Sequence, residues 1–278
     1  MTKFIERAVN LTIGAALHMF KHKFFCRPLF QKCFLIGLIH YTNFAQMSYS
    51  SAKNHWELES STVHTRTDES TFKNMSIIIS DAIDIQPSDD ILDIGCGEGS
   101  IDYYLKQNCH TLSGFDFSES KIDAARKKNP ECRYEIHSFL DKYPKYKANK
   151  LFSYGVAQYC NPADLKTFIQ QQVECIFDNK TQIKREDDMQ DYLIAILDIP
   201  DKSKAFEYYK YHYKLSSLTL ENCDSLLDKF NAIYTDGSYW QDLKMMEHIV
   251  LSFGLSSEII DSNCSYRSHL IIRFQRNT

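Results

Sequence analysis

From about residue 75 onward, short apolar runs of strand character alternate with segments of helical periodicity. The apolar runs predict strands, at residues 91–94, 111–115, 133–136, 151–154, 192–197, 258–260 and 270–274. The periodic segments predict helices, at residues 74–85, 100–107, 118–128, 162–177 and 242–253. The alternation is typical of an α/β protein with a doubly wound, mostly parallel sheet. The short separation of the last two strands predicts an antiparallel hairpin.

Residues 1–46 show a different pattern, in which apolar and basic residues lie three or four apart. Pro28 suits the first turn of a second helix, so we expect two amphipathic helices within a helical cap over residues 1–60. Residues 61–278 then form the main domain. Two interpretations of the helix pair stay open. Either it packs over the main domain, or its basic face rests on anionic lipid.

Composition and charge narrow the class of protein. The 278-residue chain is 44% hydrophobic and 24% charged, as in folded globular proteins. Its net charge of −4 gives no general reason to expect a nucleic-acid partner. Nine cysteines without a C-x-x-C pair favour free thiols over a zinc or disulfide framework, so no metal is expected and the expected location is cytoplasmic. No apolar run reaches the roughly 18–20 residues of a membrane span.

A glycine-rich motif follows the strand at 91–94 and opens the next helix. It consists of Asp93, Gly95, Gly97 and Gly99, each separated by one residue. Glycines at such a turn let the backbone approach a ligand closely. A dinucleotide motif would need glycine at position 100, where Ser100 stands, and a P-loop would need a Gly-Lys-Ser/Thr ending, which is absent.

The string ILDIGCGEGS resembles the first motif of class I S-adenosylmethionine (SAM)-dependent methyltransferases, and Asp116 ends the second predicted strand 17 residues past Gly99. In that family the second acidic residue accepts hydrogen bonds from the two ribose hydroxyls. The resemblance implies a seven-stranded sheet whose last strand is antiparallel, with SAM as the cofactor. It implies cofactor contacts from the glycine motif, Cys96 and Asp116, and an adenine site from Phe117, Ser138 and Phe139. The family often has Asp where this chain has Ser138.

The residues that follow the fourth predicted strand indicate which class of methyl acceptor to expect. Ser153-Tyr-Gly-Val156 lacks the Asn/Asp-Pro-Pro-Tyr/Phe motif of adenine and glutamine N-methyltransferases. The chain resembles the bacterial small-molecule group instead, but Gln158 and Tyr159 replace a frequent His pair, and Asn149 replaces a usual Asp. We expect methylation of an oxygen on a small polar acceptor, such as a sugar or glycan precursor. An N- or lipid-directed enzyme and a non-catalytic SAM-binding protein stay open as alternatives, and the sequence does not indicate an oligomeric state.

An aromatic segment after the fifth predicted strand is the main clue to an acceptor site. It contains Phe206, Tyr208, Tyr209, Tyr211, Tyr213, Tyr234, Tyr239 and Trp240. These side chains either line an acceptor site or fill the core of their own insertion. We expect residues 1–60 and 201–240 to meet over the SAM site as a lid. Among residues at strand ends, Asp198, Tyr154 and His137 are the candidates for a general base.

Overall fold

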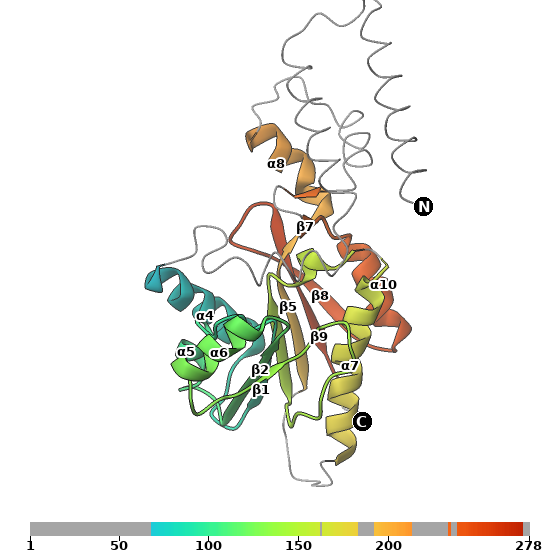
Figure 1. The fold of residues 1–278 in the computed structure, drawn as a ribbon. Helices are drawn as coiled ribbons and strands as arrows, with labels where there is room; N and C mark the ends of the chain where they lie inside the picture. The colour runs from blue at the N-terminus through green and yellow to red at the C-terminus, as the bar shows by residue number, and fades with distance from the viewer. Residues whose placement is uncertain (1–67, 162, 183–191, 213–232, 235–237, 275–278) are drawn as a thin grey trace, which may run out of the picture. The chain divides into compact units, whose positions relative to one another are not determined.

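The protein is described by a computed structural model, which covers residues 68–161, 163–182, 192–212, 233–234 and 238–274. The predicted cap over residues 1–60 therefore lies outside the described residues. A central sheet has the strand order β3-β2-β1-β4-β5-β9-β8, with β9 antiparallel to both of its neighbours (Figure 1). The strands are β1 (Asp90–Ile94), β2 (Thr111–Asp116), β3 (Arg133–Ile136), β4 (Lys150–Tyr154), β5 (Leu193–Pro200), β8 (Ser256–Asp261) and β9 (Arg267–Arg273). The predicted α/β fold, with seven strands and an antiparallel last strand, is confirmed.

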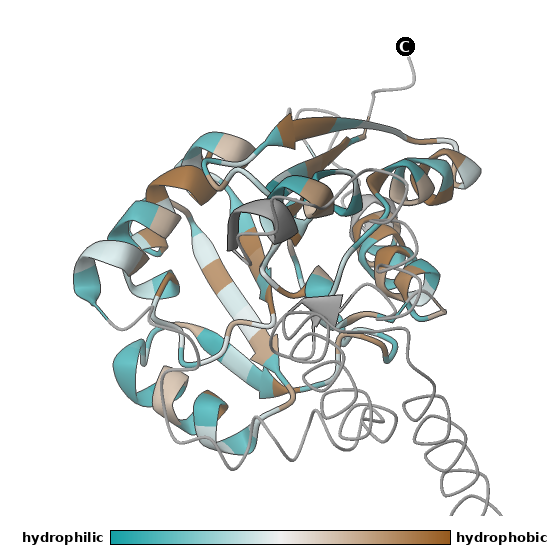
Figure 2. Cartoon of the chain, turned by 90° about the horizontal axis from the view of Figure 1, so that it is seen from above, coloured by the Kyte–Doolittle hydropathy of each residue, from teal (hydrophilic) through white to brown (hydrophobic). Residues whose placement is uncertain are grey.

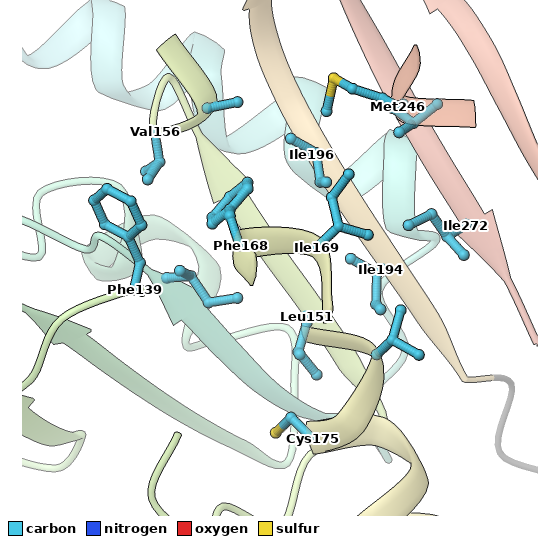
Figure 3. Close-up of a cluster of buried hydrophobic side chains, with 14 of the residues drawn as sticks. Phe139, Leu151, Val156, Phe168, Ile169, Cys175, Ile194, Ile196, Met246 and Ile272 are labelled. Carbon is cyan, nitrogen blue, oxygen red and sulfur yellow. The ribbon is translucent and has the colours of Figure 1, made fainter. Parts of the chain in front are cut away.

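Helices cover both faces of the sheet, as the view from above shows (Figure 2). They are α4 (Glu69–Ile83), α5 (Asp102–Leu105), α6 (Glu119–Lys128), α7 (Leu165–Gln182) and α10 (Leu243–Ser252). Strand β5 is buried along its whole length, and its residues alternate between two apolar clusters. Leu197 belongs to the cluster under α4, and Ile196 to the larger cluster under α7 and α10 (Figure 3). Burial on both faces explains the continuous apolar run that predicted this strand.

Two connections differ from the predicted pattern. The helix expected over residues 100–107 is the short α5, which has no side-chain cap at its start. Between β3 and β4, residues 137–149 contain no helix, and buried aromatic side chains cover this part of the sheet instead. Tyr143 and Tyr146 place their rings 4.8 and 6.2 Å from that of Phe115 in β2. Aromatic side chains of this size bury enough apolar surface to replace a helix locally.

Asn149 lies at the amino end of β4, on the edge of the sheet opposite to the glycine motif. Its side-chain oxygen accepts from the backbone N–H of Asp90 at 2.8 Å, and its amide nitrogen donates to a carboxylate oxygen of Asp89 at 2.7 Å. Lys150 neutralises Asp89 through an ion pair of 2.8 Å. An aspartate at position 149 would add a third carboxylate beside Asp89 and Asp90, so the amide satisfies this site better. The departure from the family pattern is thus a structural feature of the amino edge.

A small insertion follows β5 and precedes α10. Its described elements are the 3-10 helix η2 (Lys202–Lys204), α8 (Ala205–His212), β6 (Ile233–Tyr234) and β7 (Ser238–Tyr239). Within the described part of the chain, no helix is both long and apolar enough to span a membrane, and no group of three or more His, Cys, Asp or Glu side chains could hold a metal ion.

Candidate active site

The glycine motif forms the turn between β1 and α5, at the carboxyl edge of the sheet. Gly95, Gly97 and Gly99 all have positive φ, at 77°, 52° and 64°. A Cβ on Gly95 would lie 2.6 Å from Val156 Cγ2, so this turn packs directly against the segment after β4. A Cβ on Gly97 would meet no atom within 4 Å. The backbone at Gly97 therefore faces open space, as a turn that receives a ligand requires.

Asp116 ends β2 and is held against this turn by two backbone N–H groups. Gly97 donates to its Oδ2 at 3.1 Å and Ser118 to its Oδ1 at 2.9 Å. Burial raises the pKa of Asp116, although these hydrogen bonds and Lys121 oppose the shift. A carboxylate has about four acceptor sites on its two oxygens. Acceptor capacity therefore remains for a vicinal diol beside the turn, while the neighbouring Phe117 is half-buried.

Asp93 does not face solvent, because it belongs to a buried pair of acids. Its pKa is raised well above the usual range by burial and by Asp102, with which it shares a hydrogen bond. Burial also raises the pKa of Asp102, to about 6. Tyr134 donates to Asp102 Oδ2 at 2.8 Å. Two carboxyl groups this close cannot both ionise easily, so the pair retains a proton near neutral pH.

The acid pair continues into a network that supports the glycine turn. Asn129 donates to the Tyr134 hydroxyl at 3.0 Å and to the backbone oxygen of Gly99 at 2.8 Å. Cys96, between the first two glycines, is half-buried, and burial raises the pKa of its thiol. Sequence reasoning missed Asp102, although an acid three residues before the buried Leu105 was a signal.

The residues after β3 lie beside Asp116 but turn their side chains inward. The backbone N–H of His137 donates to the backbone oxygen of Asp116 at 3.0 Å, and its ring packs edge-to-face on Phe115 at 5.4 Å. The Ser138 hydroxyl accepts from the backbone N–H of Leu140 at 3.1 Å and so stabilises a turn. Phe139 is buried, and its ring packs edge-to-face on that of Phe168 of α7, with ring centroids 5.5 Å apart (Figure 3).

Two of the three base candidates lie on the neighbouring strands β4 and β5. Tyr154 ends β4 and is half-buried against the cluster under α4, and Asp198 lies in the neighbouring β5. His137 follows β3, three strand positions from β4, which corresponds to about 14 Å at the usual strand spacing. Tyr154 and Asp198 therefore lie near each other on neighbouring strands, whereas His137 lies beside Asp116.

Asp198 is held by two residues of β9 that sequence reasoning missed. Its carboxylate forms a buried ion pair with Arg267 at 3.0 Å, and its backbone N–H donates to His269 Nδ1 at 3.0 Å. Arg267 also donates to the side-chain oxygen of Gln158 at 3.0 Å. Gln158 belongs to the 3-10 helix η1 (Ala157–Tyr159) after β4.

The aromatic insertion forms a small core of its own, in the described part. Tyr208 and Trp240 are buried against each other, with ring centroids 5.4 Å apart, and Tyr208 lies 4.7 Å from Tyr266. Phe206 packs on the same group, and Tyr239 is half-buried. These contacts favour the second interpretation of the aromatic segment for Tyr208 and Trp240. Tyr213 and the rest of the predicted lid over 213–232 lie outside the described residues, and the side chains of Tyr209, Tyr211 and Tyr234 are not described.

Comparison with known proteins gives one family match, which covers part of the chain. Residues 91–176 match the family model described as a methyltransferase domain. No curated protein sequence matches the chain significantly.

Several solved structures have a similar fold. Magnesium protoporphyrin IX methyltransferase from Synechocystis PCC 6803 with bound SAH matches 82% of this chain and 100% of its own, at 13% identity and a TM-score of 0.52. The mitomycin 7-O-methyltransferase MmcR matches 74% of this chain and 55% of its own, at 11% identity and a TM-score of 0.51. A DhpI–SAM–HEP complex matches 81% and 95%, at 14% identity and a TM-score of 0.50.

Proposed function

We propose that this chain is a SAM-dependent methyltransferase of class I and that it transfers the methyl group to an oxygen of a small polar acceptor. The observation that carries the proposal is the arrangement at the carboxyl edge. The open turn at Gly97 and the carboxylate of Asp116 lie on one side, and Tyr154 and Asp198 lie on the other. Cofactor and acceptor groups that are separated by a few strands suit an in-line transfer between two bound molecules.

The cofactor side fits SAM on the residues present. We infer that Asp116 accepts the ribose hydroxyls and that the turn with Asp93, Gly95, Cys96, Gly97 and Gly99 lies along the rest of the cofactor. Phe117, Ser138 and Phe139 remain proposed neighbours of the adenine ring, with Phe117 best exposed for contact. When bound, SAM supplies an electrophilic methyl group, so the chain has only to orient the acceptor, exclude water and accept a proton.

For the proton acceptor we propose Asp198 first and Tyr154 second. Tyr154 and Asp198 lie near the carboxyl ends of neighbouring strands. The carboxylate of Asp198 is held by an ion pair with Arg267 of β9. A base held rigidly needs little reorganisation when the acceptor hydroxyl loses its proton. His137 is the weakest of the three candidates, because its ring packs on Phe115 and the Nε2 atom is buried without a hydrogen-bond partner.

The polar residues near the proposed acceptor site support a small polar acceptor. Asp198, Gln158 and Tyr154 offer polar groups, and the chain lacks the motif of nucleic-acid N-methyltransferases. Two solved structures with this fold are named as methyltransferases of small molecules, a porphyrin and mitomycin. An N- or lipid-directed enzyme and a non-catalytic SAM-binding protein are the alternative functions.

One experiment separates these functions. The purified protein is incubated with methyl-labelled SAM and an extract of the source cells, and the label is then fractionated. We expect label in the fraction of sugars and small metabolites, in a form that is stable to mild base, as a methyl ether is and a methyl ester is not. Label in lipid supports the lipid-directed alternative. An absence of any transferred label, together with SAM binding by calorimetry, supports the non-catalytic alternative.

Contact of residues 1–46 with a membrane is a separate proposal, supported by charge. Residues 1–50 carry six basic residues and one acidic residue, or +5, which leaves −9 for the rest of the chain. Co-sedimentation with anionic vesicles tests it. Binding that weakens with salt, and that is lost when Lys3, Arg7, Lys21 and Lys23 become Gln, supports lipid contact. Failure to bind anionic vesicles at low salt supports packing over the main domain instead.

A further inference from the structure

We propose that Arg267 and His269 of β9 are positioning residues that hold Asp198 in the conformation required at the acceptor site. The proposal rests on the function proposed above, because it takes Asp198 to face the acceptor. It adds that the antiparallel strand, and not only the ends of the parallel strands, builds the acceptor side.

The first observation is the backbone conformation of Asp198. Its φ is 57°, in the left-handed region that residues other than glycine seldom adopt. The register of β5 against β9 shifts between Ile196 and Ile199, so Asp198 lies within a bulge. Bulges frequently redirect a side chain next to an active site. An unusual conformation persists only where the surrounding structure imposes it.

The second observation is that side chains of β9 bind the groups that the bulge removes from regular strand pairing. The backbone N–H of Asp198 donates to His269 Nδ1 at 3.0 Å. Arg267 Nη1 donates both to the backbone oxygen of Asp198 at 2.6 Å and to its carboxylate at 3.0 Å. The exposed fractions of the three residues are only 3%, 4% and 6%. Two side chains therefore fix the main chain and the carboxylate of one residue.

The hydrogen bond from Asp198 also determines the tautomer of His269. Because Nδ1 accepts a hydrogen bond from a backbone N–H, it carries no proton, and the neutral ring is protonated at Nε2. Burial lowers the pKa of His269, and Lys204 lowers it further, while the charge of Asp198 opposes the shift. Protonation of Nδ1 would remove the acceptor and release the backbone of Asp198. His269 is therefore an acceptor that positions Asp198 and is not itself poised as a base at Nδ1.

Arg267 extends the same support to the end of β4. Its Nη2 donates to Gln158 Oε1 at 3.0 Å. The guanidinium of this β9 residue therefore contacts both Asp198, within β5, and Gln158, which follows β4. A planar guanidinium with several donors suits such a three-way contact, which a lysine could not reproduce. This contact gives Gln158 a role in holding Arg267.

The test compares His269→Leu, which removes the acceptor, with His269→Asn, whose side-chain oxygen can replace Nδ1. Arg267→Lys is the third variant, and Arg273→Gln, at the exposed end of β9, is the control. The measurements are the rate of label transfer into the acceptor fraction, SAM affinity by calorimetry, and the ¹⁵N shifts of the His269 ring. We expect the ring to be neutral and protonated at Nε2 at pH 7.

We expect His269→Leu and Arg267→Lys to lower the transfer rate by about tenfold or more, with SAM affinity within about twofold of the wild type. His269→Asn restores most of the rate and abolishes the acid-side loss of activity that follows protonation of His269 in the wild type. The proposal is wrong if Nδ1 is the protonated nitrogen, or if His269→Leu transfers label at the wild-type rate. It is also wrong if SAM affinity falls in parallel, since that indicates general damage.

Failure of the proposed function is distinguishable from failure of this inference. If wild-type protein transfers no label, the function is rejected, whereas the ring ¹⁵N shifts and the Asp198 conformation in a crystal structure of His269→Leu still decide the positioning role. A left-handed Asp198 that persists in His269→Leu rejects it, and an Asp198 that moves to another conformation supports it.

Discussion

Asp116 is the residue on which the cofactor assignment depends most directly. Asp116→Ala removes the carboxylate that lies against Gly97 and Ser118. We expect SAM affinity to fall by about 100-fold, or roughly 3 kcal/mol, because a charge-assisted pair of hydrogen bonds is lost. Calorimetry measures the change, and Asp141→Ala, an exposed acid after β3, is the control. Unchanged affinity in Asp116→Ala would contradict the assignment.

Asp102 makes the stability of the protein depend on pH. Its pKa is raised by burial to about 6, so the native state binds more protons than the unfolded state between about pH 4 and pH 6. The free energy of unfolding therefore falls as pH rises through this range. Asp102→Asn keeps an acceptor for Tyr134 and removes the charge. We expect it to be more stable than the wild type at pH 8, by on the order of 1 kcal/mol, and to lose this advantage at pH 4.

Chemical denaturation at the two pH values measures this difference, with Asp81→Asn on the exposed face of α4 as the control. An Asp102→Asn variant that is less stable than wild type at pH 8 would show that the ionised pair is favourable.

Asp198 is tested as a base by Asp198→Asn. Asparagine tolerates the left-handed region and keeps an oxygen for Arg267, so the backbone should be preserved. We expect the single-turnover rate to fall by ~10²–10⁴, the usual contribution of a general base, with SAM affinity retained. Asp201→Asn, which weakens the cap of η2 instead, is the control and should lose much less. A loss of less than about tenfold in Asp198→Asn excludes Asp198 as the base.

At the scale of elements, one buried amide connects the insertion to the segment after β4. Gln241 donates to the backbone oxygens of Ala157 and Cys160 at 2.7 and 2.8 Å. Gln241→Ala leaves both buried oxygens without this donor, and we expect the free energy of unfolding to fall by about 2–3 kcal/mol. Gln170→Ala, which removes a partly exposed contact with Glu174, should change it by less than about 0.5 kcal/mol. Equal effects in urea unfolding would mean that the buried amide has no special role.

Elements with a clear apolar signal could be predicted from sequence, and the polar ends of two strands could not. The strand predicted at 133–136 coincides with β3, and that at 111–115 differs from β2 by one residue. By contrast, β5 continues through Asp198 to Pro200, and β9 begins at Arg267 rather than at residue 270. Polar residues interrupt the apolar pattern from which a strand is predicted. Asp198 and Arg267 are nevertheless buried, because they form hydrogen bonds with each other across the sheet.

The same reason separates the parts of the site that sequence could and could not predict. The glycine motif and Asp116 lie at fixed short spacings on consecutive elements, so their proximity follows from the fold. Arg267 and His269 are two positions apart and so lie on the same face of β9. The bulge in β5 decides which residue of β5 they contact. Register changes of this kind depend on long-range packing, which no local pattern records.

At the scale of the whole molecule, the sheet is built from pairings of very different sequence separation. The contact between Thr111 and Asp90 in the β1–β2 pair spans 21 residues, whereas that between Arg267 and Asp198 spans 69. Closing a longer loop costs more chain entropy and is generally slower. The insertion with α8 lies inside the longer loop, which adds further chain to order before β9 can pair.

The position of β9 between β5 and β8 therefore implies an order of assembly. The β1–β2 and β2–β3 pairs join residues that are close in sequence, whereas the β5–β9 pair joins distant ones and completes the sheet when the β8–β9 hairpin docks on β5. We expect pulsed hydrogen exchange during refolding to protect the amides that join β1 to β2 before those that join β5 to β9. Simultaneous protection would contradict this order. Because the contact between Asp198 and Arg267 depends on this last pairing, the bulge in β5 gains its support only when the sheet is complete.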